Sequence, residues 1–111
     1  MQQLTPSSSL AISAVWQRDD HLDIRFDGEF DEEDFTPLTQ RVLDRLDNAR
    51  VLENIPGADR HNVRFSLQLA GQNGYFVLNF EVYSQSCWLA AESDSELLIL
   101  TELHHLLSGG T

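Results

Sequence analysis

The stretch from Val63 to Val82 constrains this chain more than any other, because two strictly alternating runs flank a glycine-containing segment at residues 71–74. Apolar residues at every second position are typical of a half-buried antiparallel hairpin. The pattern therefore predicts which side chains enter the core. They are Val63, Phe65, Leu67 and Leu69 in the first run and Phe76, Leu78, Phe80 and Val82 in the second.

The turn chemistry between the two runs predicts their register. Asn73-Gly74 is the pair favoured in two-residue type I′ turns, and a turn at this pair places Leu69 opposite Leu78. A wider loop of four residues would shift the pairing by two and keep the same faces. The hydrophobic pattern fits both registers, and the turn chemistry favours the first.

A first hairpin is predicted before this stretch. Residues 10–16 and 22–26 alternate on either side of a polar segment, which is the signal for two paired strands. In the first of these strands we expect one side to carry Leu10, Ile12, Ala14 and Trp16.

Two helices complete the expected fold. The first begins near Asp34 or Thr36, behind an acidic run that suits the positive end of a helix dipole. The second opens at Ser93, with Glu96 in position for a capping box. The element order ββαββββα predicts an α+β fold, with a single antiparallel sheet of about six strands and both helices packed on one face. We expect residues 1–9 to form a flexible tail and residues 10–108 to form one domain; further strands are expected at 50–55, 62–70 and 87–91.

The charge balance restricts the partners of the chain. Eighteen acidic residues face seven basic ones, all of them arginine, and the net charge is −11. Nucleic acids and anionic membranes are bound through cationic surfaces, so we expect neither as a partner. Mechanisms that need a lysine, such as a Schiff base or a P-loop, are excluded. The acidity either serves solubility or forms a face that matches a basic partner.

Several features favour a cytoplasmic location. The chain has a single cysteine, Cys87, which excludes an internal disulfide and suits a reducing compartment. No apolar run approaches the roughly 18 residues of a membrane span. The first nine residues lack the basic and apolar regions of a secretory signal.

The open face of the sheet is the first candidate site. If Phe76 and Phe80 lie under the helices, the alternate residues of the same strand point the other way. Aromatic and arginine side chains are enriched in protein interfaces. Alternatively, the face has no binding role. Aromatic residues are common in strands, and Arg64 near Glu81 would make an ordinary cross-strand pair. We expect this face to bind a protein partner or a second copy of the chain through Arg64, Tyr75, Tyr83 and Trp88, the last on condition that Cys87 and Leu89 point inward.

An alternative site lies at Asp59, Arg60 and His61, just before the long hairpin. These residue types are able to orient a substrate carboxylate and transfer a proton. Neighbouring residues in an extended segment point to opposite faces, so Asp59 and His61 act together and Arg60 does not. The structural interpretation is a turn in which Asp59 bonds backbone N–H groups and Arg60 pairs with an acidic neighbour.

Other reactive residues give no sharper hypothesis. Glu102 and His105 have helical i, i+3 spacing, but a di-metal bundle needs further glutamates on other helices. Cys87 is expected to be buried and inert in a strand. We therefore expect no metal, no cofactor and no catalytic residue.

One resemblance adds to this interpretation. The segment Gly57-Ala58-Asp59-Arg60-His61, the alternating hairpin and Cys87-Trp88-Leu89 before a final acidic-capped helix resemble a family of short gamma-proteobacterial proteins of unknown function. The resemblance covers Phe26 to Leu107. It implies a cytoplasmic bacterial protein and carries no activity, cofactor or catalytic residue.

Overall fold

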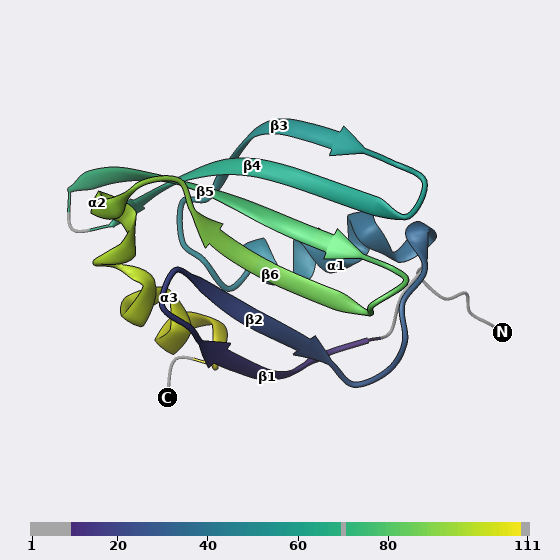
Figure 1. Ribbon diagram of the computed structural model, residues 1–111. Helices are drawn as coiled ribbons and strands as arrows, with labels where there is room; N and C mark the ends of the chain where they lie inside the picture. Colours follow the sequence, from purple (N-terminus) through teal and green to yellow (C-terminus); the bar gives the residue numbers. More distant parts are fainter. Residues whose placement is uncertain (1–9, 70, 110–111) are drawn as a thin grey trace, which may run out of the picture.

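The chain folds into one curved antiparallel sheet with its helices packed on one face, as a computed structural model shows (Figure 1). The structure describes residues 10–69 and 71–109, so the expected tail at 1–9 lies outside the described residues. The spatial order of the strands is β1-β2-β6-β5-β4-β3. In chain order the elements are β1 (Ile12–Gln17), β2 (His21–Phe26), the 3-10 helix η1 (Glu32–Asp34), α1 (Phe35–Leu43), β3 (Arg50–Pro56), β4 (Arg60–Leu69), β5 (Gln72–Glu81), β6 (Ser86–Ala91), α2 (Asp94–Leu97) and α3 (Leu100–Leu107).

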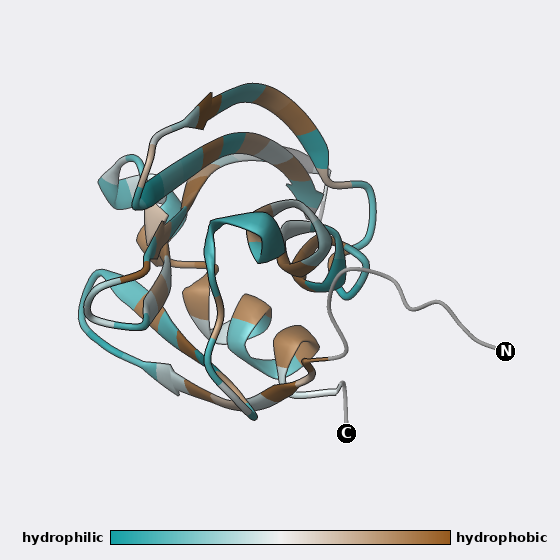
Figure 2. Cartoon of the chain, turned by 90° about the vertical axis from the view of Figure 1, so that its right-hand side faces the viewer, coloured by the Kyte–Doolittle hydropathy of each residue, from teal (hydrophilic) through white to brown (hydrophobic). Residues whose placement is uncertain are grey.

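The predicted α+β class and element order are confirmed, with one refinement. The second predicted helix is two helices, α2 and α3, which Leu98 and Ile99 separate. The sheet curves around the helices, so its concave face holds the core and its convex face carries no helix (Figure 2). Within the described residues, no helix is long and apolar enough to cross a membrane.

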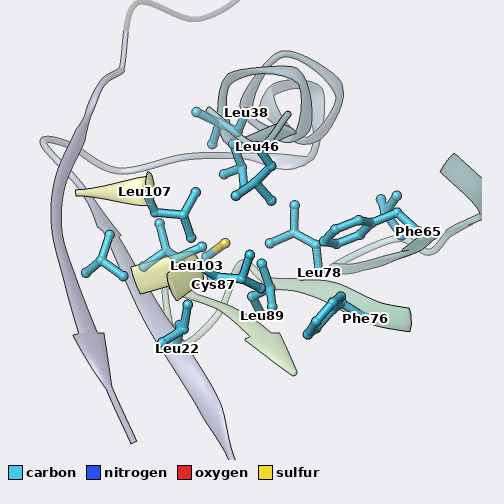
Figure 3. Packing of buried hydrophobic residues seen from close by; sticks show 14 of the residues in the cluster. Leu22, Leu38, Leu46, Phe65, Phe76, Leu78, Cys87, Leu89, Leu103 and Leu107 are labelled. Atoms are coloured by element: carbon cyan, nitrogen blue, oxygen red, sulfur yellow. The ribbon is translucent and has the colours of Figure 1, made fainter. Parts of the chain in front are cut away.

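The core lies between the sheet and the helices, and the alternating pattern predicted its strand side correctly. Phe65, Phe76, Phe80 and Leu89 are each at most 1% exposed. Helix α1 adds Leu38, and α3 adds Leu103 and Leu107, which meet the sheet residues in the centre of the core (Figure 3). Each such side chain contributes about 1.5–3 kcal/mol when it leaves water, so this layer accounts for most of the stability of the fold.

The predicted register of the long hairpin is wrong. Leu69 pairs with Gln72, and Phe65 pairs with Phe76, so Asn73 and Gly74 lie within strand β5 and do not form the turn. Gly71 has a φ of +80°, a left-handed conformation that glycine adopts without strain. The wider four-residue loop is excluded as well. Because the shift in pairing is even, both strands still present the predicted faces to the core.

Gly74 is needed for packing and not for the turn. A Cβ atom at this position would lie 3.0 Å from the Phe76 ring, 3.2 Å from Ile99 and 3.3 Å from Glu96. The residues of α2 and the segment after it therefore pack directly against the backbone of β5 at Gly74. The glycine that suggested a turn in the sequence instead makes room for a helix.

The expected orientation of β1 is also corrected. A bulge lies between Ile12 and Ala14, and a bulge shifts the alternation of the residues that follow it. As a result Val15 is buried in the core, whereas Trp16 is 47% exposed on the other face.

Candidate functional site

The convex face of the sheet carries a row of side chains that crosses all six strands. Paired residues of neighbouring strands point to the same face, and the row can be traced through the register from one edge of the sheet to the other. Its members are Trp16, Asp23, Trp88, Asn79, Asn62 and Ile55, from β1 to β3. Both tryptophans of the chain therefore lie on the face that no helix covers.

The centre of this row is tied together by amide side chains. Asn62 donates from Nδ2 to Oδ1 of Asn79 at 2.6 Å, and Asn79 donates in turn to the backbone carbonyls of Val77 and Trp88. Asn79 is largely buried although it belongs to the open face. These bonds hold the Asn62 and Asn79 side chains in a fixed arrangement at the centre of the row, which lowers the entropy that binding would cost there.

Tyr75 and Arg64 form a second part of the open face. Arg64 contacts both carboxylate oxygens of Glu92, at 2.5 and 3.2 Å, and its guanidinium lies 5.4 Å from the centre of the Tyr75 ring. The Glu92 carboxylate hydrogen-bonded to Arg64 raises the pKa of the guanidinium. The expected pair with Glu81 is wrong, because Glu81 accepts from Arg60 at 2.9 Å.

Tyr83 was expected on this face as part of a strand. It follows the end of β5 and lies in the turn before β6, where it is 85% exposed. Trp88 was expected on the open face on condition that Cys87 and Leu89 point inward. Both are buried in the core, so this condition is met. Sequence reasoning missed Trp16, and only the bulge in β1 explains why it lies on the open face.

The charges of the open face are largely paired among themselves. Arg18 bonds Asp23 at 2.8 Å, and the ion pairs of Arg60 and Arg64 repeat the arrangement farther along the sheet. Arg25 lies over the Trp16 ring, with its guanidinium 5.3 Å from the ring centre. Exposed ion pairs contribute only about 0–1 kcal/mol each to stability, but they leave this face nearly neutral in a chain of charge −11.

The structure separates the three residues of the alternative site. Arg60 lies on the convex face, and His61 is 5% exposed on the opposite face. The carbonyl of Asp59 accepts a hydrogen bond from the N–H of Val82 at 2.9 Å. Within the described residues, no hydrogen bond or ion pair joins the Asp59 side chain to His61, so the expected pair is not assembled.

His61 has a distinct environment of its own. Its Nε2 atom contacts Oδ1 of Asn54, and its ring lies 5.2 Å from the Phe35 ring and 6.3 Å from the Phe80 ring, centre to centre. Burial lowers the pKa of this imidazole, so the ring is neutral at pH 7. It lines two adjoining cavities between α1 and β3.

The remaining reactive side chains are placed as follows. Burial, followed by the nearby charge of Asp23, raises the pKa of the Cys87 thiol well above its usual value, and the thiol is therefore protonated in the core. Among the residues that the structure describes, no three His, Cys, Asp or Glu side chains are grouped so that they could hold a metal ion.

Comparison with known proteins gives a family and no activity. A family model described as "Protein of unknown function (DUF3630)" matches residues 12–108. The match runs from the start of β1 to the end of α3 and thus includes the first hairpin, which the resemblance noted in the sequence did not cover. No curated protein and no solved structure matches the chain. The chain belongs to DUF3630, a family of proteins of unknown function.

Proposed function

We propose that this domain is a non-enzymatic module that binds another protein through the convex face of its sheet. The observation that carries the proposal is the position of Trp16, Trp88 and Tyr75 on the one sheet face without a helix. Tryptophan, tyrosine and arginine dominate the binding energy of protein interfaces. A face that combines them on rigid strands is suited to recognition.

The shape and charge of this face indicate the chemistry of the partner. The face is convex (Figure 2), so a partner with a concave, largely uncharged surface fits it best. Three of its carboxylates, Asp23, Glu81 and Glu92, are already paired with arginines. We therefore expect binding that depends on aromatic contacts and changes little with salt, because screening acts mainly on unpaired surface charges.

The first experiment compares four immobilised proteins in a pull-down from a lysate of the source organism. They are the wild type, Trp16→Ala, Trp88→Ala and the control Leu98→Ala, which removes an apolar side chain that is 84% exposed at the junction of α2 and α3. We expect a protein that the wild type and Leu98→Ala retain and that both tryptophan variants lose. Circular dichroism verifies that each variant is folded.

The second experiment uses the captured protein in purified form. Both tryptophans of the chain lie on the proposed face, so a tryptophan-free partner should shift their fluorescence to shorter wavelength as it excludes water. Sedimentation of the chain alone tests a second copy as the occupant. Retention of the same proteins by all four baits, or unchanged fluorescence with every captured protein, would overturn the proposal.

A further inference from the structure

A cleft runs between the first helical segment and the edge of the sheet, on the side opposite the convex face. One cavity of about 400 Å³ is lined by residues of η1, the start of α1 and the loop after β3. A second cavity of about 160 Å³ lies between α1 and β3. Both are lined by Thr36 and His61, so the two cavities adjoin at these residues.

The two ends of the cleft differ in chemistry. Glu32 and Glu33 of η1 line one end, and neither carboxylate takes part in an ion pair within the described residues. Three carboxylates of the convex face, by contrast, have arginine partners. The other end of the cleft is more apolar, because Leu43, Val51 and Val63 contribute to its lining beside the polar residues Thr39, Gln40 and Asn54.

His61 supplies a fixed polar group between these ends. Oδ1 of Asn54 is only able to accept a hydrogen bond, so the neutral imidazole donates to it from Nε2. The other ring nitrogen, Nδ1, is then an acceptor with a free lone pair. The contacts with Phe35 and Phe80 hold the ring in place, so His61 is a fixed part of the lining of both cavities.

We propose that the cleft binds an organic cation whose charged head lies at Glu32 and Glu33 and whose apolar chain extends past His61 toward Val51. The head is an ammonium or guanidinium group, because unpaired carboxylates and a neutral imidazole acceptor all favour a cationic donor. The group belongs either to a small alkylamine or to an arginine side chain of a peptide. This site is independent of the convex face, so the two proposals fail or succeed separately.

The first test uses n-hexylamine as the probe and follows backbone amide signals by NMR. We expect the signals of Thr36, His61 and Val51 to move in a saturable way. Glu32→Gln/Glu33→Gln should weaken binding about tenfold, a loss of about 1.4 kcal/mol. The matched control, Glu29→Gln/Glu102→Gln, changes the net charge by the same amount at exposed positions outside the cleft lining and should bind as the wild type does.

Further probes separate the two ends of the cleft and the two ligand sources. Val51→Ser should weaken n-hexylamine about threefold without affecting methylamine, because it removes apolar contact only at the far end. Hexanoate should not bind. An acetylated and amidated peptide with one arginine between leucines tests the peptide source. Tighter binding of this peptide than of n-hexylamine assigns the site to a protein ligand, and the reverse order assigns it to a small amine.

Two results would overturn the inference. Equal weakening by both double variants would mean that the amine is attracted only by the overall negative charge. Absence of any saturable shift at Thr36 and His61, with n-hexylamine and with the peptide at millimolar concentration, would mean that the cleft takes no cation. His61 is not changed in these tests, because a buried side chain is a poor choice for separating binding from folding.

Discussion

The carboxylate of Glu96 accepts a hydrogen bond from the backbone N–H of Tyr75, at 2.8 Å from Oε2. Because Glu96 lies in α2 and Tyr75 in β5, this bond ties the C-terminal helices to the middle of the chain. The hydroxyl of Ser93 donates to the other carboxylate oxygen. The Ser93 hydroxyl therefore does not bond a backbone N–H as the expected capping box requires, and Glu96 bonds β5 directly beside Gly74.

We expect Gly74→Ala to destabilise the domain by about 1–3 kcal/mol, the usual cost of inserting an atom into a packed site. The added Cβ would meet Phe76, Ile99 and Glu96 at 3.0–3.3 Å, and it would push α2 away from β5. Urea denaturation measures the change. The control is Gly71→Asn, since asparagine tolerates the left-handed conformation and nothing lies within 4 Å of an added Cβ. A larger loss for Gly71→Asn than for Gly74→Ala would contradict this explanation.

Glu96 should make the free energy of unfolding depend on pH in the acid range. Burial raises the pKa of this carboxyl, but hydrogen bonds from the Ser93 hydroxyl and from the backbone N–H groups of Tyr75, Glu96 and Ser93 together outweigh burial and lower it. A lowered pKa in the folded state gives stability that is present above about pH 4.3, the unfolded value, and is lost as the pH falls through the folded value. We expect Glu96→Gln to be less stable than the wild type at pH 7, with a smaller difference at pH 3. A difference that stays constant between these pH values would exclude the carboxylate as its source.

The alternation of the long hairpin predicted the buried faces, whereas the turn residues did not predict its register. Faces repeat every two residues, so they survive any even shift in pairing. The register depends on whether Gly71 or Gly74 makes the turn. In the structure Gly71 has the left-handed φ, and Gly74 packs against Glu96 of α2, a helix that begins 20 residues later in the sequence. A local pattern does not contain that contact.

The alternation of buried and exposed residues also predicted part of the candidate face. Arg64, Tyr75 and Trp88 lie on the convex face because they alternate with buried neighbours. Trp16 was expected on the same side of the strand as Ile12. The bulge between Ile12 and Ala14 moves it to the other face, and a bulge leaves no clear signal in an alternating sequence. Tyr83 was assigned to a strand that ends at Glu81. The cleft at His61 depends on how α1 meets β3, which follows from tertiary packing alone.

Phe80→Ala should cost about 3–5 kcal/mol, as expected for a large aromatic side chain removed from a core. The Phe80 ring lies 5.4 Å from the Phe35 ring and 5.9 Å from the Phe30 ring, so its loss opens a cavity where β5 meets the first helix. Thermal and urea denaturation measure the effect. The control Tyr83→Ala removes an aromatic side chain that is almost fully exposed and should change the stability by no more than about 0.5 kcal/mol. Similar losses for both variants would contradict the assigned faces.

Thr39→Val should stabilise the domain by about 1 kcal/mol. The hydroxyl oxygen of Thr39 is buried and has no hydrogen-bond partner among the described residues, and an unsatisfied buried polar group is costly. Valine keeps the branched shape and removes the hydroxyl. Thr36→Val on the exposed side of the same helix is the control, and its stability should not rise. A loss of stability in Thr39→Val would show that the hydroxyl has a favourable role.

His61 should make the domain less stable as the pH falls below about 6.5. Burial lowers the pKa of this imidazole, so the unfolded chain takes up the proton first, near pH 6.5. Stability is then fully present above that value and falls with pH until the folded state is protonated as well. In His61→Gln, which keeps a polar side chain near Asn54 but does not titrate, we expect the free energy of unfolding to change less over this range. His105→Gln, at an exposed position of α3, serves as the control and should keep the pH dependence of the wild type. Identical pH profiles for His61→Gln and the wild type would mean that the buried ring does not couple protonation to unfolding.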